Sequence, residues 1–526
     1  METKYILAID LGTSGPKVAI VSVSGDVIVH EFEKTKTIFL SGGGVEEDPD
    51  DWWQAILSAA KKVLQKQMVP RENIIAICCT SQWSGTVAVD KTGAHLMNAI
   101  TWMDSRGAPY VKKITDGIIK IEGYGLLKLK KWLSLTGGIP LRTGKDPIAH
   151  ILYIKNKYPG IYEKTFKFLE PKDYLNLRLT GEFFASNESI TLHWVTDNTN
   201  INDIHYDDEL IKMSGISRDK LPDLKKAVDI IGPVKKEIAR ELGLNEDTKV
   251  VMGTPDMHSA AIGSGAVDDF AGHLYIGTSS WLLCHVPFKK TDLFHNMGSL
   301  PSAIPGKYLL INEQDIAAEA LHFLRDNIIF PDDELTPQNK PDDVHEAFNR
   351  LAKTIPAGCD NLIFTPWLNG ERSPVDDQMI RGGFHNISLK ITRAHMIRAV
   401  LEGVAFNSKW LLTYVEKFIK RPLRQINIIG GGAGSDLWCQ IHADVLDRTI
   451  RRVKDPIQAN VRGAGLLASV GLGYITFDDI CEKITFDGIF TPNPENKNLY
   501  KQLFKQYVMI YNKNKKIHKK LNKIKK

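Results

Sequence analysis

A short turn pattern that occurs once in each half of the chain constrains the fold more than any other feature. Asp10-Leu-Gly-Thr-Ser-Gly ends an apolar strand predicted over residues 5–10, and Tyr275-Ile-Gly-Thr-Ser-Ser ends another over residues 273–276. After each turn an apolar stretch predicts a returning strand. Because the same strand–turn–strand unit appears twice, the pattern predicts a duplicated domain with one such hairpin in each half.

The surrounding sequence predicts a mixed α/β fold. After the first hairpin come predicted strands over residues 17–23 and 27–32, a helix over 52–67 and a strand over 74–80. A meander followed by alternating helix and strand is typical of an α/β sheet. A chain of 526 residues is too long for one ordinary core, so we expect two domains, residues 1–265 and 266–526.

Composition predicts a globular protein without a membrane span or a disulfide framework. Hydrophobic residues make up 43% of the chain, but no window approaches ~18 uncharged apolar residues. The six cysteines are scattered, with no zinc-like spacing, which favours a reducing cytoplasmic location. The net charge of +5 comes largely from a lysine-rich end, residues 513–526, so no nucleic-acid binding is expected for the body of the protein.

The C-terminal tail is predicted to be a docked helix with a basic end. Tyr500, Leu503, Phe504 and Tyr507 recur at helical spacing. The lysines beyond them could touch RNA or an acidic membrane, but a solvated helix end is the simpler interpretation.

Both hairpins are suited to binding phosphate. Glycine in a tight turn lets the backbone approach an anion, and the turn amides and hydroxyls are donors. Asp10 precedes the first turn, where a carboxylate suits Mg²⁺. Glycine, threonine and serine are also ordinary turn residues, so one hairpin alone would mean little. Two related hairpins favour a phosphate chain held between domains.

A third motif, Gly253-Thr-Pro-Asp-Met257, follows a strand predicted over residues 250–252. Thr254 is a suitable helix cap and Pro255 suits the first helical position, which places Asp256 in the first turn. The helix dipole there would favour a charged carboxylate that can act as a base. The alternative is an ordinary acidic residue at a helix start.

A glycine run, residues 430–434, precedes a helix that Ser435 can cap, just as Thr392 can cap a helix further upstream. The run lacks the spacing of a dinucleotide fingerprint and the lysine of a P-loop. It could admit a flat ring or a phosphate, or serve only as a turn that packs a helix.

The order of these motifs resembles the FGGY family of carbohydrate kinases over most of the chain. The matching segments are Asp10-Leu-Gly-Thr-Ser-Gly-Pro-Lys17, Glu46-Glu-Asp-Pro-Asp-Asp-Trp-Trp53, Thr101-Trp-Met-Asp-Ser-Arg106, Pro171-Lys-Asp-Tyr-Leu-Asn-Leu-Arg-Leu-Thr-Gly-Glu182, Gly253 to Gly265, Ile276-Gly-Thr-Ser279, Thr392-Arg-Ala-His-Met-Ile-Arg-Ala-Val-Leu-Glu-Gly403 and Gly430-Gly-Gly-Ala433. The resemblance implies two ribonuclease-H-like domains, as in actin and hexokinase, with the active site in the cleft between them. Residues 1–265 would bind sugar and phosphate and supply the base. Residues 266–526 would bind ATP and end in the basic tail.

The resemblance also implies residue roles. These are Asp256 as general base, Asp10 as a ligand of Mg²⁺, Thr13, Ser14, Lys17, Gly277 and Thr278 at the ATP phosphates, Gly431, Gly432 and Ala433 at adenosine, and Gln82, Trp83, Ser84, Trp102, Asp104 and Asp256 around the sugar. The resemblance to this family is also compatible with a homodimer.

The implied activity is ATP-dependent phosphorylation of a sugar or polyol hydroxyl. D-xylulose, giving D-xylulose 5-phosphate, is the first candidate substrate, with another ketose, a polyol or gluconate as alternatives. Trp83-Ser84 stands where xylulose kinases usually have Met-His, which leaves the sugar contacts open. An ATPase of the actin or chaperone type, which shares both hairpins, and a degenerate kinase acting as a binding protein are further alternatives.

Overall fold

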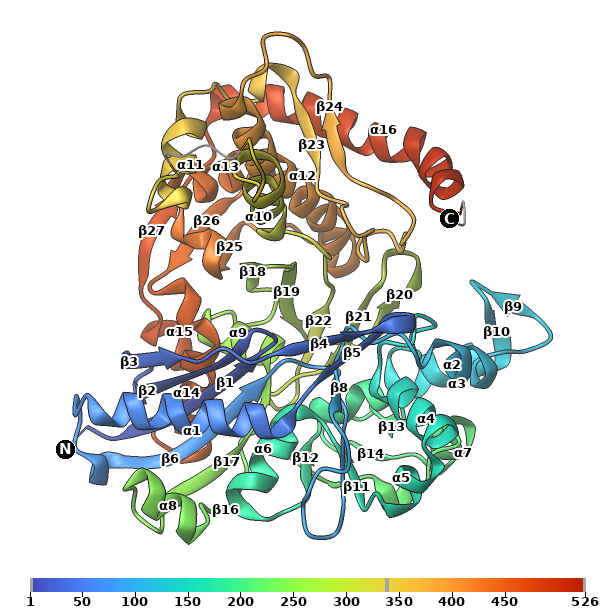
Figure 1. Ribbon diagram of the computed structural model, residues 1–526, viewed down its shortest axis with the longest axis vertical. Helices are drawn as coiled ribbons and strands as arrows, with labels where there is room; N and C mark the ends of the chain where they lie inside the picture. The colour runs from blue at the N-terminus through green and yellow to red at the C-terminus, as the bar shows by residue number, and fades with distance from the viewer. Residues whose placement is uncertain (1–2, 336–339, 524–526) are drawn as a thin grey trace.

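The structure, a computed structural model that describes residues 3–335 and 340–523, has two lobes, each built on a mixed β-sheet (Figure 1). The first sheet has the order β16-β17-β6-β1-β2-β3. Its strands are β1 (Tyr5–Gly12), β2 (Gly15–Ser22), β3 (Val27–Phe32), β6 (Ile74–Ser81), β16 (Ile230–Pro233) and β17 (Lys249–Pro255). The second has the order β20-β21-β22-β19-β18-β25-β26-β27. Its strands are β18 (Gly272–Ile276), β19 (Ser280–Val286), β20 (Thr291–Asp292), β21 (Met297–Pro301), β22 (Tyr308–Ile311), β25 (Gln425–Ile429), β26 (Thr449–Val453) and β27 (Phe486–Phe490).

Helices surround both sheets. Those of the first lobe are α1 (Pro49–Gln65), α2 (Ala108–Ile114), α3 (Leu126–Thr136), α4 (Pro147–Lys157), α5 (Pro159–Lys164), α6 (Pro171–Thr180), α7 (Asp208–Ser214), α8 (Lys236–Leu242) and α9 (Asp256–Gly263). Those that follow are α10 (Glu319–Leu324), α11 (Val344–Lys353), α12 (Arg393–Ile419), α13 (Asp436–Leu446), α14 (Ala459–Gly471), α15 (Ile480–Lys483) and α16 (Lys497–Leu521). No helix in residues 3–335 or 340–523 is long and apolar enough to cross a membrane.

Short strands complete the lobes. A three-stranded sheet joins β4 (Thr37–Leu40), β5 (Gly44–Glu47) and β8 (Ala99–Ile100). Two-stranded ladders pair β7 (Val87–Val89) with β11 (Lys167–Leu169), β9 (Lys120–Ile121) with β10 (Tyr124–Gly125), β12 (Phe184–Ser186) with β15 (Asp223–Lys225), β13 (Thr196–Asp197) with β14 (His205–Tyr206), and β23 (Ile363–Thr365) with β24 (Gly383–His385).

The central strand β1 is apolar along both faces because helices cover both faces. Leu7, Ile9 and Leu11 belong to the core that includes α1, whereas Ile6 and Ala8 belong to the core that includes α9 and α14. Successive side chains of a strand point to opposite faces, so a continuous apolar run indicates burial on both sides. This arrangement places the carboxyl end of β1, with Asp10, at the edge that faces the second lobe.

Two helices cross tightly where the lobes meet. A Cβ atom on Gly263 of α9 would lie 1.8 Å from the Ala459 carbonyl oxygen, and one on Gly463 of α14 would lie 1.9 Å from the Ser259 carbonyl oxygen. Only glycine permits so close a contact between two backbones. The crossing explains Gly263 in the motif that follows Asp256.

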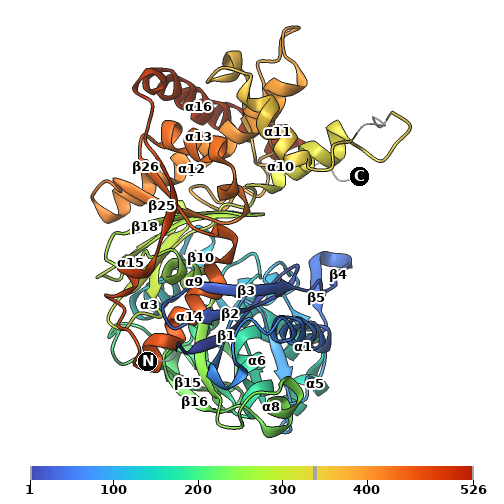
Figure 2. The same ribbon diagram turned by 90° about the vertical axis from the view of Figure 1, so that its left-hand side faces the viewer.

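A boundary after Gly265 remains our proposal. In its support, all strands of the first large sheet come from β1 through β17, and all strands of the second come from β18 through β27. Helix α14, however, packs against β1, β2 and β6, and Figure 2 shows it lying across the strands of the first lobe. The division between sheets is therefore sharper than the division between helices.

Several predicted elements are confirmed. The predicted strand over 27–32 is β3, and the predicted tail helix is α16, in which Tyr500, Leu503 and Tyr507 are buried and Phe504 is partly buried. The last residues of the lysine-rich end, 524–526, lie outside the described part of the chain.

Both predicted caps at the later helices are also confirmed. The Ser435 hydroxyl accepts from the Trp438 amide at 3.1 Å, and Thr392 forms a capping box with His395.

Candidate active site

The first hairpin is a two-residue turn that projects from the sheet edge. Asp10 pairs with Lys17 and Gly12 with Gly15 across β1 and β2, which leaves Thr13 and Ser14 at the tip. Gly15 has φ = 135°, and a Cβ there would lie 1.9 Å from the Glu33 carbonyl oxygen. Glycine is required at this position because a side chain has neither the conformation nor the space.

The second hairpin joins β18 to β19. Its carbonyl groups are held by two consecutive amides, since Ala317 N donates to Thr278 O and Ala318 N donates to Gly277 O, both at 2.8 Å. The Thr278 side chain is exposed. Both carbonyl groups of the turn therefore have hydrogen-bond donors within the second lobe, and the tip of the hairpin at Thr278 can face a ligand.

Asp256 lies in the first turn of α9, as predicted, but the start of the helix differs from the prediction, because Pro255 ends β17 and Asp256 itself is the first helical residue. Strand β17 continues through Pro255, so Thr254 is a buried strand residue and its predicted capping role is wrong. No side chain caps this helix. The Asp256 carboxylate instead accepts from the next amide, Met257 N, at 2.8 Å.

The electrostatics of Asp256 suit a proton acceptor. Burial and then the negative charge of Asp10 raise the pKa of Asp256 from 3.8 to about 8. A carboxylate with a pKa near neutrality binds a proton far more tightly than an ordinary aspartate, which is the property of a general base. Asp10 lies near the end of β1 and Asp256 directly follows β17. Both strands run parallel to β6, so the two carboxylates lie at the same edge of the sheet.

Asp10 has the surroundings of a metal ligand. Burial raises its pKa, and the positive charge of Lys17 and a long hydrogen bond from Asn460 Nδ2, 3.4 Å, oppose that rise only in part. Lys17 Nζ is itself committed elsewhere, donating to Ile457 O at 2.7 Å. An incompletely neutralised carboxylate beside a second carboxylate fits a hard divalent cation such as Mg²⁺.

Three predicted residues are joined by hydrogen bonds at the first hairpin. Trp102 Nε1 donates to Thr13 Oγ1 at 3.1 Å, and Thr13 Oγ1 donates to Gln82 Oε1 at 3.1 Å. Gln82 Nε2 then donates to buried Glu47 at 2.8 Å. The predicted phosphate and sugar contacts thus form one connected network within the first lobe.

The remaining predicted sugar residues have partners inside the lobe. Trp83 Nε1 donates to Ser189 O at 3.0 Å, and Ser84 Oγ donates to Lys145 O at 2.8 Å. Asp104 is 1% exposed and accepts from Arg106 Nε at 2.8 Å. Their role at a sugar remains a prediction.

The glycine loop of the second lobe lies against the second hairpin. Gly430 has φ = 92°, and a Cβ there would lie 2.6 Å from Ile276 O, while one on Gly432 would lie 2.4 Å from Ile276 Cγ2. Ala433 is buried, whereas Gly431 is exposed and has open space where a Cβ would point. The loop therefore offers bare backbone beside the hairpin, as an adenosine site requires.

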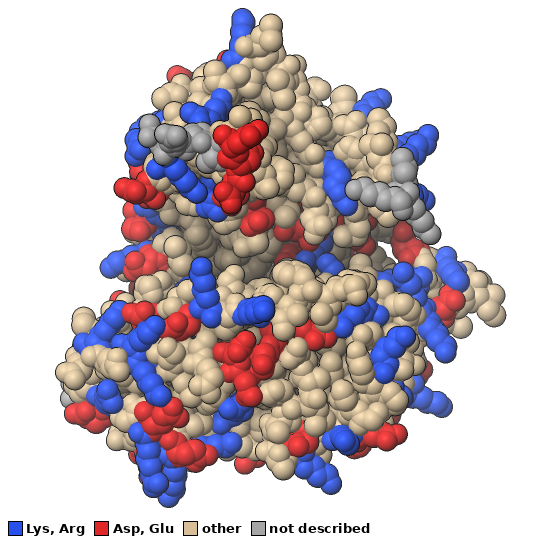
Figure 3. Space-filling view, in the orientation of Figure 1, with Lys and Arg blue, Asp and Glu red and all other residues tan. Residues whose placement is uncertain are grey.

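The structure adds charged residues that no sequence motif indicates. Glu313, Asp315 and Arg372 come from the second lobe, where Arg372 forms an ion pair with each carboxylate. Lys145 of the first lobe interacts electrostatically with all three. The sequence alone could not indicate these residues, because none of them belongs to a short motif with a known spacing. Figure 3 shows the hollow between the two lobes.

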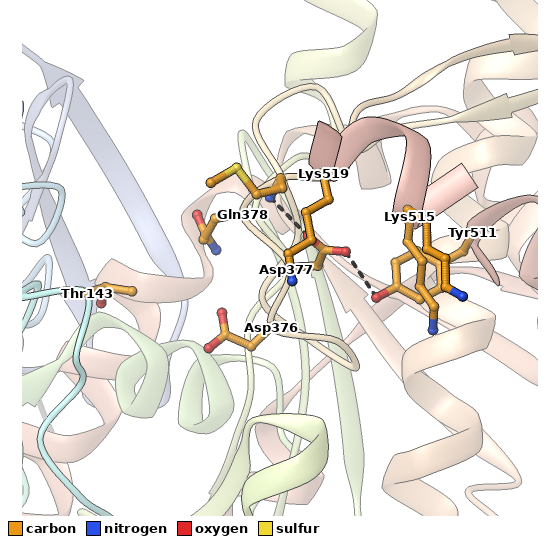
Figure 4. Close-up of a pocket in the computed structure, with 9 residues that line it drawn as sticks. Thr143, Asp376, Asp377, Gln378, Tyr511, Lys515 and Lys519 are labelled. Atoms are coloured by element: carbon orange, nitrogen blue, oxygen red, sulfur yellow. Dashed lines mark hydrogen bonds between the residues drawn. The ribbon is translucent and has the colours of Figure 1, made fainter. Parts of the chain in front are cut away.

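A cavity of about 530 Å³ is lined by neither the hairpins nor Asp256 (Figure 4). Thr143 of the first lobe, the segment from Asp376 to Met379, and the tail helix line it, with Tyr511 donating to Asp377 at 3.2 Å.

A glycine-containing hairpin in each lobe and a carboxylate with a raised pKa fit the expectation of a phosphotransferase. The sequence matches the FGGY family of carbohydrate kinases, N-terminal domain, over residues 5–263 and the C-terminal domain of that family over residues 273–472. The chain therefore belongs to the FGGY family of carbohydrate kinases, and ATP is one of its substrates.

Relatives match over nearly the whole length. A xylulose kinase of Staphylococcus epidermidis is 30% identical, with 98% of each chain covered. The structure of a gluconate kinase from Lactobacillus acidophilus superimposes with a TM-score of 0.85 at 28% identity, covering 99% of this chain and 100% of that one. A ligand-bound xylulose kinase from the same organism gives 0.85 at 27% identity, covering 98% and 100%.

The adenosine assignment predicts a selective defect. We expect Gly431→Val to raise KM for ATP about tenfold, because the new side chain would occupy the space open to the nucleotide. Thermal stability should hardly change, since nothing lies within 4 Å of that space. Gly434→Val is the matched control, because Gly434 also has open space but is not assigned to adenosine. Equal KM values for both variants would remove Gly431 from the site.

Proposed function

We propose that the chain transfers the γ-phosphoryl group of ATP to a primary hydroxyl of a neutral sugar, converting D-xylulose to D-xylulose 5-phosphate. The observation that carries the proposal is the position of Asp256, a carboxylate with a pKa of about 8 between the two hairpins. Asp256 accepts the hydroxyl proton as the sugar oxygen bonds to the γ-phosphorus. The bond to the bridging oxygen breaks, and ADP leaves with its electron pair.

The hairpins supply the electrostatic part of the reaction. The amides of Thr13, Ser14 and Thr278 would face the phosphates, with Lys17 beside them. The Gly277 amide donates to Ser279 O at 3.0 Å, so Gly277 would contribute close approach of the backbone rather than a donor. Asp10 would hold Mg²⁺, which neutralises charge on the phosphate oxygens when bound. Gly431, Gly432 and Ala433 would contact adenosine. The crossing of α9 and α14 is the natural pivot for closure of the lobes over both substrates.

The charges of the cleft favour a neutral sugar over an acidic one. The carboxylates around the cleft outnumber the cations there even when Asp256, with its pKa of about 8, is left out as largely protonated near neutral pH. They are Asp10, Glu313, Asp315 and Asp376, against Lys17, Lys145 and Arg372. An aldonate would add one more negative charge, whereas ATP would enter together with Mg²⁺. Gluconate remains the second candidate because a gluconate kinase is among the similar structures.

A substrate panel tests the sugar. ADP release should be measured with D-xylulose, D-ribulose, glycerol and gluconate, and without any acceptor. We expect the highest kcat/KM for D-xylulose and a value for gluconate at least about tenfold lower, because one repelled charge costs roughly 1.4 kcal/mol. A preference for gluconate would overturn the neutral-sugar proposal. ADP release that needs no acceptor would instead identify an ATPase.

We also infer a reducing, cytoplasmic location. The six cysteines form no disulfide, and five are buried: Cys78, Cys79, Cys284, Cys359 and Cys439. Burial raises the pKa of Cys78 to about 12, which makes its thiolate scarce and the thiol unreactive. A homodimer and the absence of nucleic-acid binding remain predictions.

A further inference from the structure

One side chain of the second lobe reaches across the cleft to the first. Arg372 follows β23, and its guanidinium carbon lies 5.1 Å from the centre of the Trp102 ring. Trp102 donates in turn to Thr13 at the tip of the first phosphate hairpin, at 3.1 Å. A guanidinium over an indole face is held by electrostatic attraction that grows as water is excluded. The contact therefore connects the second lobe to the first hairpin through a single aromatic ring.

The Arg372 head is fixed by two carboxylates of its own lobe. It forms ion pairs with Glu313 and, through Nε, with Asp315 Oδ1 at 2.6 Å. The Arg372 side chain is 19% exposed, and a planar fork of donors can pair with both carboxylates while its face stays free for stacking.

Hydrogen bonds also hold the backbone of Arg372 in place. Its amide donates to the buried carboxylate of Glu371 at 2.9 Å, and Asn407 Nδ2 donates to the same carboxylate at 2.6 Å. Asn407 is part of the long helix α12, so Arg372 moves with the core of the second lobe.

Glu313 connects Arg372 to the second hairpin. Burial raises the pKa of Glu313, whereas the charge of Arg372 and the nearby Ser279 hydroxyl oppose that rise. Ser279 belongs to the second phosphate turn. Arg372 thus touches the first hairpin through Trp102 and the second through Glu313, so both ends of the phosphate path depend on its position.

We propose that Arg372 is a positioning residue, whose guanidinium packs over the Trp102 ring and thereby sets the distance between the two phosphate hairpins. Because Trp102 lies on the sugar side of the cleft, productive closure of the lobes then depends on that side. The proposal rests on the proposed function only for the placing of sugar near Trp102. It concerns geometry and assigns Arg372 no contact with the reacting atoms.

Lysine is the informative replacement. It keeps the positive charge beside Glu313 and Asp315 but cannot stack flat on the indole while pairing with both. A residue that served only to neutralise those carboxylates would accept this change. A residue that sets the separation of the hairpins would lose kcat, because small errors in the alignment of reactants are costly.

The test is a double-mutant cycle on the full chain with Arg372→Lys, Trp102→Leu and the double variant. We expect Arg372→Lys alone to lower kcat about 10–100-fold with KM for ATP changed less than about threefold. In the Trp102→Leu background the same change should cost at least about fivefold less, since contacting residues couple. Equal effects in both backgrounds would overturn the proposal.

Two controls keep the outcomes distinct. Arg448→Lys alters a half-buried ion pair with Glu416 (2.7 Å) away from the cleft and should leave kcat unchanged. Melting temperatures of all variants separate misfolding from misalignment. Wild-type turnover on the substrate panel tests the proposed function separately, because the cycle can be run with whichever sugar is phosphorylated. If Arg372→Lys retains wild-type kcat, the positioning role is refuted whatever the sugar.

Discussion

Replacing Asp256 with asparagine should lower kcat about 10³-fold while leaving the affinity for ATP within about threefold of wild type. The amide keeps the shape of the carboxylate and its place at the start of α9 but cannot accept the hydroxyl proton. Loss of a general base typically costs 10²–10⁴-fold. The measurement is steady-state turnover with a saturating sugar, together with ATP binding by calorimetry.

Asp247→Asn is the matched control for this substitution. Asp247 is exposed in the same lobe and should tolerate the change without loss of turnover. Turnover of Asp256→Asn within about tenfold of wild type would remove Asp256 from the role of base. Loss of ATP binding in that variant would indicate a structural role instead.

Replacing Asp10 with asparagine should have two separable effects. We expect kcat/KM to fall about 10²-fold at limiting Mg²⁺, with a higher concentration of the metal needed for half-maximal rate, because the amide is a weaker ligand. We also expect the pH profile to shift, because Asp10 is the second cause of the raised pKa of Asp256.

The sign of the pH effect follows from the charges. Asp256 acts only when deprotonated, so kcat/KM should rise with pH through its pKa of about 8 in the free wild-type enzyme. Removing the negative charge of Asp10 makes the charged form of Asp256 easier to reach. The rising limb should therefore move to lower pH in Asp10→Asn, measured as kcat/KM for Mg²⁺–ATP, because that ratio reports the enzyme before metal and nucleotide bind. A limb that stays in place or moves to higher pH would contradict the interaction between the two carboxylates.

Local sequence patterns predicted the fold well where the physical cause is local. Strand β3 and the caps of α12 and α13 follow from alternation and from hydroxyl side chains that satisfy free amides. The cap at Asp256 failed for the opposite reason. Thr254 has the right residue type, but pairing with β6 extends β17 through Pro255 and keeps Thr254 in the strand.

The sequence predicts only those site residues that belong to a motif. Thr13 and Gln82 are adjacent in space because β1 and β6 are parallel neighbours, a pairing that the structure shows. Arg372 contacts Trp102 across 270 positions of sequence, and neither residue type is unusual where it stands. A contact between lobes leaves no periodic or spaced pattern in a single sequence, so only the fold reveals it.

If Asp256 receives a proton from the sugar hydroxyl, a crystal structure with D-xylulose and a non-hydrolysable ATP analogue should show the two groups in contact. We expect a carboxylate oxygen of Asp256 about 2.6–3.2 Å from a primary hydroxyl oxygen that faces the γ-phosphorus. A structure in which that hydroxyl pairs with another carboxylate, such as Glu47, while Asp256 contacts no sugar atom would contradict it.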